Sequence, residues 1–141
     1  MSIEENKAVV RRFAEECWMA GKLDVLDEVV TEDLVRSGTP VGRQGMASLI
    51  TMIRTALPDL TGTITDLIAE GDQVVWRYSS RGTHTGGPLF GVPPTGKVLT
   101  WTGTATLRLA GGKITEISDN VDMLAIYQQL GLVAVPGHPG G

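Results

Sequence analysis

The chain has 141 residues and a formal net charge of −4, and its acidic residues are spread along its whole length. A chain of this size can bury roughly 68% of its unfolded surface, so we expect one domain over residues 1–135 and a disordered Pro/Gly tail at 136–141. The absence of a basic stripe excludes a nucleic-acid partner. No apolar run approaches the ~18 residues of a membrane span, and the polar start predicts no signal peptide.

The single cysteine and the two histidines predict neither a disulfide nor a metal site. Cys17 lies on the apolar side of a helical pattern and is expected to be a small core residue in a reducing compartment, hence a cytoplasmic protein. His84 and His138 are far apart in the sequence, without a cysteine cluster beside them. No Gly-rich run stands between a strand and the start of a helix, which argues against nucleotide binding. We therefore expect no cofactor.

Three helices are predicted in the first part of the chain. Ser2 and Glu5 have the spacing of a capping box, and they open a helix that continues to about Ala20. A short helix over Leu23–Val30 and a longer one over Arg43–Leu57 follow, the last stopped by proline. The apolar stripes of these helices need a surface to cover, so we expect four of their side chains on the concave face of a sheet: Phe13, Leu49, Ile50 and Ile53.

The second part of the chain is rich in predicted strands. An extended segment at Thr31–Ser37 precedes the third helix, and the later strands are Leu60–Ala69, Gln73–His84, Val98–Leu109 and Lys113–Val121. A Gly/Pro-rich loop interrupts them at Gly86–Gly96, and a last helix runs from Asp122, its predicted N-cap, to Gly131. Helices followed by antiparallel strands indicate an α+β fold, with N-terminal helices packed on a curved, mostly antiparallel sheet.

Asp119 lies between apolar residues on one face of the last predicted strand. Because strand side chains alternate between faces, it shares a face with the β-branched residues Ile117 and Val121. Either this face is solvated and the acid has no special role, or the acid lies in an apolar cavity and has a function. The strand pattern alone leaves both interpretations open.

Six short motifs occur in order along the chain: Leu57-Pro58-Asp59, Ile68-Ala69-Glu70-Gly71-Asp72, Gly82-Thr83-His84-Thr85-Gly86, Gly91-Val92-Pro93-Pro94-Thr95-Gly96-Lys97, Gly112-Lys113-Ile114 and Gln129-Leu130-Gly131. Together they resemble the SnoaL-like polyketide cyclases, which belong to the nuclear-transport-factor-2-like superfamily of cone-shaped α+β barrels. The resemblance covers about residues 5–132 and implies a cofactor-free enzyme. Its expected reaction closes a ring in an aromatic polyketide ester by intramolecular aldol condensation, as in antibiotic biosynthesis.

The resemblance also implies a role for Asp119. The family's acid/base aspartate lies seven residues after the Gly-Lys-Ile motif and ten before Gln-Leu-Gly, which is the position of Asp119 here. A histidine that some cyclases carry on the preceding strand falls at about Ala105, and Arg36 stands where many relatives have His or Asn. Met19 and Ser118 replace the common Asn and Trp of the family.

An aldol closure needs a base, donors for the enolate and an acid for the new alkoxide. An exposed aspartate is a weak base, so we expect apolar burial to raise the pKa of Asp119. His84, before the Gly-rich loop, is the second predicted catalytic residue, with a histidine that merely fixes the loop as the alternative. The predicted substrate-binding residues are Trp76, Tyr78, Trp101, Arg36 and Phe90, and sequence does not decide which face of the Trp76–Tyr78 strand lines the cavity.

Two classes of function stay open. An acid/base enzyme on a hydrophobic small molecule is the leading interpretation, with isomerase, dehydratase, epoxide hydrolase and hydroxylase-like reactions as variants on the same cone. The other class is a non-catalytic ligand-binding or dimerisation module. An inert binder has no reason to bury an unpaired carboxylate, so an Asp119 that faces solvent or is locked to an arginine would favour the binder. We also expect a homodimer or homotetramer built through the outer face of the sheet, because the predicted strands Gln73–His84 and Val98–Leu109 carry apolar residues on both faces.

Overall fold

The computed structural model describes residues 2–133, so the predicted tail at 136–141, with His138, lies outside the described residues. The elements in chain order are α1 (Ile3–Arg12), η1 (Phe13–Met19), η2 (Leu23–Val25), α2 (Leu26–Val29), β1 (Val30–Arg36), α3 (Gly42–Ala56), β2 (Thr61–Glu70), β3 (Gln73–Thr83), β4 (Val98–Ala110), β5 (Lys113–Val121) and α4 (Met123–Gln129). Each helix in this range is too short or too polar to span a bilayer.

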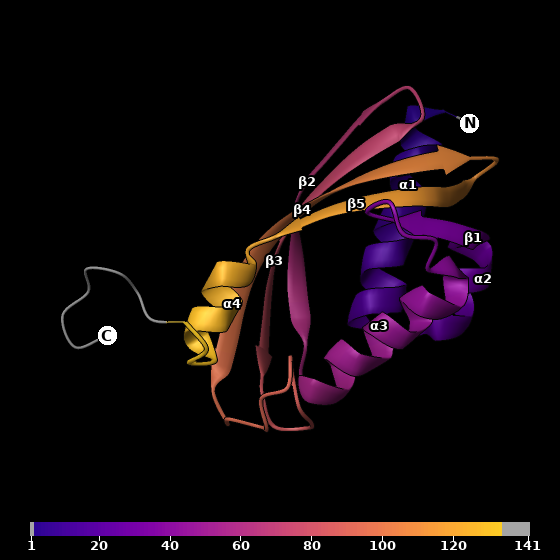
Figure 1. Ribbon diagram of the computed structural model, residues 1–141. Helices are drawn as coiled ribbons and strands as arrows, with labels where there is room; N and C mark the ends of the chain where they lie inside the picture. The colour runs from indigo at the N-terminus through magenta and orange to yellow at the C-terminus, as the bar shows by residue number, and fades with distance from the viewer. Residues whose placement is uncertain (1, 134–141) are drawn as a thin grey trace.

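The five strands form one curved sheet in the order β1-β5-β4-β3-β2. All neighbours are antiparallel except β1 and β5, which run parallel. Helices α1 and α3 lie together on one side of the sheet, and α4 lies beside β4, away from them (Figure 1). The predicted α+β class is confirmed, with one refinement: β1 and β2 are the edges of the sheet and do not pair, so the barrel is open.

The first helix begins with the predicted capping box and changes from an α-helix to a π-helix at Phe13. The Ser2 hydroxyl accepts a hydrogen bond from the Glu5 backbone N–H at 3.0 Å, and the Glu5 carboxylate accepts one from the Ser2 N–H at 3.3 Å. From Phe13 the helix continues as a π-helix, a form that recurs at functional sites. Cys17 is fully buried there, and burial raises the pKa of its thiol to about 12, which keeps it an unreactive core residue.

The core lies between the helices and the concave face of the sheet. Phe13 and Ile50 are almost completely buried there, and Leu49 is partly buried against the same group of core residues. Ile53 is partly buried against a second apolar cluster, which includes Leu57 and Leu99. The prediction that these helical stripes pack on the sheet is therefore confirmed.

The outer face of the sheet is more polar than the sequence led us to expect. The apolar side chains of β3 and β4, with few exceptions such as Val75, share the concave parity, and the outer parity of β4 is threonine at positions 100, 102, 104 and 106. The apolar outer surface on which we based the expected oligomer is thus absent from the described sheet. The oligomeric state itself stays a prediction.

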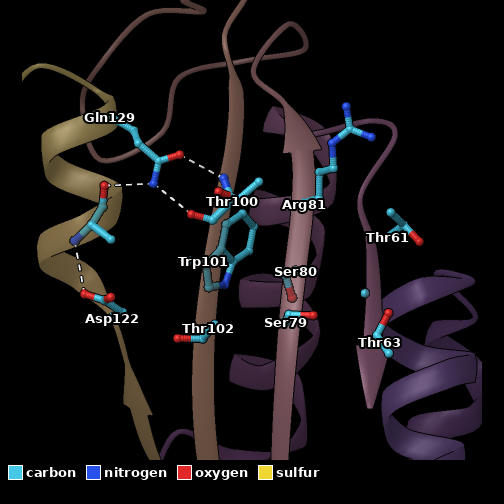
Figure 2. Close-up of a pocket in the computed structure, with 12 residues that line it drawn as sticks. Thr61, Thr63, Ser79, Ser80, Arg81, Thr100, Trp101, Thr102, Asp122 and Gln129 are labelled. Atoms are coloured by element: carbon cyan, nitrogen blue, oxygen red, sulfur yellow. Dashed lines mark hydrogen bonds between the residues drawn. The ribbon is translucent and has the colours of Figure 1, made fainter. Parts of the chain in front are cut away.

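Gln129 closes an exposed strand edge. Because β5 pairs with β4 only from Gly103 onward, the preceding stretch of β4 has a free edge that faces α4. The Gln129 side-chain amide accepts from the Thr100 N–H at 2.9 Å and donates to the Thr100 carbonyl at 2.7 Å (Figure 2). It therefore pairs with the backbone as a neighbouring strand would, which fixes α4 on the sheet.

Candidate functional site

A cavity of about 490 Å³ lies between the concave face of the sheet, the π-helix, α3 and α4. Most of its lining is aliphatic or aromatic, with a smaller number of polar groups that come from several elements, which is the pattern of small-molecule sites. Six of the seven residues predicted for the site line it: Asp119, Arg36, Trp76, Tyr78, Trp101 and Phe90. The concave parity of β3, which sequence left undecided, is therefore that of Trp76 and Tyr78.

Asp119 and Arg36 form an ion pair on the wall of the cavity. The parallel pairing of β1 with β5 places Arg36 beside Ile117, two residues from Asp119. The Arg36 Nε donates to Asp119 Oδ2 at 2.6 Å, and the two side chains are 33% and 19% exposed. The guanidinium therefore holds one of the two carboxylate oxygens.

This pairing corrects one expectation. Asp119 does lie on an apolar cavity, but it is not the unpaired carboxylate that the sequence suggested. A paired aspartate is the arrangement that we associated with a binder. The two side chains are nevertheless joined by a single hydrogen bond. Among residues 2–133, neither Oδ1 of Asp119 nor the two Nη groups of Arg36 make a hydrogen bond. One carboxylate oxygen and two cationic donors stay available to a ligand.

The Tyr78 ring occupies the space that a side chain at position 103 would need. The two residues are register partners on β3 and β4, and a Cβ on Gly103 would collide with the Tyr78 hydroxyl and ring. The absent side chain therefore lets the phenol lie over β4 and toward Asp119. Burial, followed by the negative charge of Asp119, raises the pKa of Tyr78 to about 12, against the smaller opposing effect of Arg36. Tyr78 is thus a neutral hydroxyl at physiological pH.

We expect Gly103→Ala to displace Tyr78 and to destabilise the fold by about 1–3 kcal/mol, as overpacking of a core does. Gly103 has no positive φ, so the cost should be steric alone. Chemical denaturation of the single variants and of Gly103→Ala/Tyr78→Leu measures this. The double variant should lose less than the sum of the singles. Strict additivity would show that the collision is not the cause.

The raised pKa of Tyr78 predicts a loss of stability in alkali. Between the unfolded value near 10 and the folded value of about 12, the folded state binds more protons than the unfolded state. The free energy of unfolding should therefore fall as the pH rises through this window. Thermal unfolding of the wild type and of Tyr78→Phe between pH 9 and 12 tests this, because the phenylalanine variant lacks the titrating group. Parallel curves for the two proteins would contradict it.

Aromatic and aliphatic side chains form most of the remaining wall of the cavity, which also contains the polar residues Arg11, Glu15, Thr63, Ser79 and Ser80. Trp101 faces it from β4, and Phe90 reaches it from the Gly/Pro-rich loop. The Phe90 ring packs edge-on against Tyr127 of α4, with ring centroids 5.7 Å apart, and so joins the loop to the last helix. These residues would enclose the apolar part of a ligand.

His84 does not lie on the cavity, and its predicted catalytic role is not supported. The side chain is 0% exposed. Its Nε2 lies 2.8 Å from the Gly87 carbonyl, and its Nδ1 accepts from the Thr95 N–H at 3.3 Å. Both nitrogens are therefore used inside the loop, which requires the neutral ring with the proton on Nε2. The alternative of a histidine that fixes the loop describes this geometry.

Several cavity residues escaped the sequence analysis because they are indistinguishable from core in a helical pattern. They come from the π-helix, from α3 and its C-cap residue, and from α4: Trp18, Met19, Leu49, Ile53, Leu57, Met123 and Ile126. An apolar stripe carries no signal that separates a residue facing a cavity from one facing a filled core. Leu49 and Ile53 were predicted to pack on the sheet, but not to line a site.

Asp122 lines a different pocket from Asp119. Its carboxylate accepts from the Ala125 N–H at 3.1 Å, which confirms the predicted N-cap of α4. Together with Arg81, Gln129 and the threonines of β2 and β4, it lines a polar depression on the outer face of the sheet (Figure 2). Of these two carboxylates near the end of β5, only Asp119 lines the apolar cavity.

Fold and cavity together define a small α+β protein with an open cone and an acidic residue inside. The sequence matches the family of SnoaL-like polyketide cyclases over residues 8–130, and the chain belongs to this family. None of the curated proteins compared with it matches.

Solved structures support the same assignment. TsrD from Streptomyces laurentii is similar with a TM-score of 0.86 and 24% identity, over 94% of this chain and 99% of that one. AclR from Streptomyces galilaeus, a proposed hydroxylase, has a TM-score of 0.84 and 29% identity, over 96% and 91%. IdmH from Streptomyces antibioticus, a proposed polyketide cyclase, has a TM-score of 0.78 and 29% identity, over 89% and 98%. The family and the fold are thus established, and the names of the relatives span more than one reaction.

Proposed function

We propose that this protein is a cofactor-independent acid/base enzyme that closes a ring in a polyketide ester by intramolecular aldol condensation. The observation that carries the proposal is a carboxylate on a largely apolar cavity that is paired to a cation through one oxygen and has, among residues 2–133, no hydrogen-bond partner for the other. The volume of about 490 Å³ suits a planar molecule of a few fused rings.

The chemistry divides between the two members of the pair. Oδ1 of Asp119 would accept a proton from a carbon that lies between two carbonyl groups. The Nη groups of Arg36 would then donate to the enolate oxygen, where charge develops and where fixed donors have their largest effect. Once the carbon–carbon bond has formed, the protonated Asp119 would return its proton to the new alkoxide. The atoms balance without a further reactant, and the product is an isomer of the substrate.

The apolar walls would supply positioning. A folded-back substrate that brings its two reacting carbons together avoids much of the entropic cost of the reaction, and such orientation is worth roughly 7–11 kcal/mol in favourable cases. Trp101 and Phe90 offer aromatic surfaces for a planar ring system. The ion pair and the aromatic rings would together fix the direction in which the substrate binds.

Deuterium exchange tests this proposal without knowledge of the natural substrate. The probe is methyl 3-(naphthalen-2-yl)-3-oxopropanoate, an aromatic β-keto ester with an acidic methylene group. In D2O the protein should accelerate deuteration of this methylene above the buffer rate. A panel of aromatic polyketide methyl esters should then give a product of unchanged mass and altered absorption, as ring closure requires.

A non-catalytic ligand-binding module is the second candidate, and the ion pair of Asp119 is the observation that favours it. This candidate predicts that the β-keto ester binds without faster exchange. A hydroxylase, as proposed for AclR, would instead give a product that is one oxygen atom heavier. Binding without exchange, for the probe and for the whole panel, would refute the acid/base function.

A further inference from the structure

The Tyr78 hydroxyl faces the cavity without a partner among the described residues. The Tyr78 side chain lies on the concave face of β3 and lines the cavity. Among residues 2–133, the buried polar side-chain atoms that lack a hydrogen-bond partner are Asn6 Oδ1 and Trp76 Nε1. The Tyr78 hydroxyl also makes no hydrogen bond in this range, but it is not one of these buried atoms, so a water-sized molecule can reach it. The phenol can therefore donate its proton to a ligand in the cavity.

The sheet register places this hydroxyl on the side of Asp119 that is opposite to Arg36. Tyr78 pairs with Gly103 on β4, and its hydroxyl lies in the space that a Cβ on Gly103 would occupy. Gly103 pairs with Val121 on β5, and Asp119 lies two residues before Val121 on the same face. Such diagonal neighbours on adjacent strands are about 7–8 Å apart, a separation that a long side chain and a ligand can bridge. Arg36 reaches Asp119 from β1, which lies on the other side of β5.

The hydroxyl keeps its proton and is held in place. Burial and the negative charge of Asp119 raise the pKa of Tyr78 to about 12, so the phenol is a donor at neutral pH. The Trp76 ring lies beside the phenol, with ring centroids 4.7 Å apart, and the missing side chain of Gly103 leaves room for the hydroxyl. A donor that is already oriented needs no reorganisation when charge develops beside it, and this is the property of an oxyanion site.

We propose that the Tyr78 hydroxyl is a catalytic donor that hydrogen-bonds one oxygen of a 1,3-dicarbonyl enolate while Arg36 binds the other. This inference rests on the proposed function, since it assigns the group that stabilises the second carbonyl oxygen. The carbon between the two carbonyl groups would lie at Asp119, and the two oxygens would point toward β1 and β3. Because the charge of such an enolate is shared by both oxygens, a donor at each of them stabilises it. The site would thus select substrates in which two carbonyl groups flank the acidic carbon.

Binding of a stable enolate tests the proposal independently of turnover. The probe is 2-hydroxy-1,4-naphthoquinone, a planar bicyclic compound whose anion at neutral pH shares its charge between two oxygens on either side of one ring carbon. The reference ligand is 2-methoxy-1,4-naphthoquinone, which keeps the ring system but has no charge. Both are titrated into full-length protein carrying Asp119→Asn, whose neutral amide stands in for the protonated acid. We expect Tyr78→Phe in this background to weaken binding of the enolate by about 10-fold or more, with little effect on the reference ligand.

Tyr127→Phe is the matched control, because it removes the same atom from the only other tyrosine of the chain. Tyr127 lies on α4, packs against Phe90 and is not one of the residues that line the cavity. Its substitution should leave the affinity for both ligands unchanged. If Tyr78→Phe weakens the two ligands equally, or changes enolate binding no more than Tyr127→Phe does, the hydroxyl does not bind the enolate and the proposal is overturned.

A role of Tyr78 in positioning Asp119 would give a different result. The hydroxyl would then hydrogen-bond the carboxylate instead of the substrate, and Tyr78→Phe would slow deuterium exchange in protein that retains Asp119. The same substitution would leave enolate binding in the Asp119→Asn background unchanged. This combination of results would overturn the proposed donor and make Tyr78 a positioning residue.

A carbon-13 resonance reports on the hydroxyl directly. In Asp119→Asn protein labelled with carbon-13 at the Cζ of tyrosine, the further change Tyr127→Phe leaves Tyr78 as the only labelled residue. The enolate should move this resonance downfield, as stronger donation from a phenol does, and the reference ligand should not. Equal shifts with both ligands would overturn the proposal. A shift specific to the enolate, together with no acceleration of deuterium exchange, would instead overturn the catalytic function and retain the enolate-binding hydroxyl.

Discussion

Asp119→Asn should lower the rate of proton exchange and of ring closure by about 10²–10⁴-fold while the substrate still binds. Asparagine keeps the size of the side chain and can still accept a hydrogen bond from Arg36, but it cannot take a proton from carbon. Loss of a general base has this magnitude in many enzymes. The residual rate should stay above that in buffer because the cavity continues to position the substrate. Exchange kinetics and calorimetric titration of the same β-keto ester measure the two effects.

Asp122→Asn is the matched control for this substitution. Both changes replace a carboxylate near the end of β5 with an amide, but Asp122 caps α4 and lines the outer hollow. Asparagine caps helices about as well as aspartate, so stability and exchange should both stay near the wild-type values. A normal rate in Asp119→Asn with a loss in Asp122→Asn would show that the chemistry belongs to the other carboxylate. Normal rates in both would refute acid/base catalysis.

The structural elements that depend on a local sequence pattern could be predicted. The capping box, the alternation of β5 and the stop at Pro58 are local features, and the elements that they define are present. Strand parity alone placed Asp119 with Ile117 and Val121. The cavity that they share could not be predicted with the same security, because it also depends on how far the sheet curves and where the helices lie.

The partners of Asp119 depend on contacts between distant parts of the chain. Arg36 is 83 residues away and reaches it only because β1 joins the sheet parallel to β5. Trp76 pairs with Ala105 and Ala105 with Asp119, and this register includes a shift at Arg108/Leu109 between β4 and β5. No periodicity in the sequence encodes a parallel edge strand or a bulge. Arg36 and Trp76 could therefore be named as cavity candidates, but their arrangement around the acid could not.

Motifs that carry the family resemblance hold the fold together and lie largely outside the cavity. Asp59 accepts hydrogen bonds from the N–H and hydroxyl of Thr83, at 2.6 and 2.7 Å. Gln129 closes the edge of β4, and His84 fixes the Gly/Pro-rich loop. This explains why the motifs identify the fold securely while the reaction stays open, and why His84, a histidine within a motif, lies away from the cavity.

Arg36→Met should slow turnover strongly and should change the stability of the fold very little. The variant keeps an extended side chain but removes the cation beside Asp119 and the two Nη donors. Removing a fixed donor to a developing oxyanion typically costs about 10²–10³ in rate. The pair is partly exposed, so its loss should change the free energy of unfolding by about 1 kcal/mol or less. Exchange kinetics and chemical denaturation of one preparation provide both numbers.

The double variant Arg36→Met/Asp119→Asn shows whether the pair acts as one unit. If the arginine serves the proton transfer carried out by Asp119, it has little left to assist once the base is gone. The double variant should then be nearly as active as Asp119→Asn alone, far from the product of the two single losses. Fully multiplicative losses would mean that Arg36 acts on the substrate independently of the base. An Arg36→Met protein that binds the β-keto ester far more weakly but exchanges the bound ester at the normal rate would make the arginine a residue of binding, and would contradict its proposed role at the enolate.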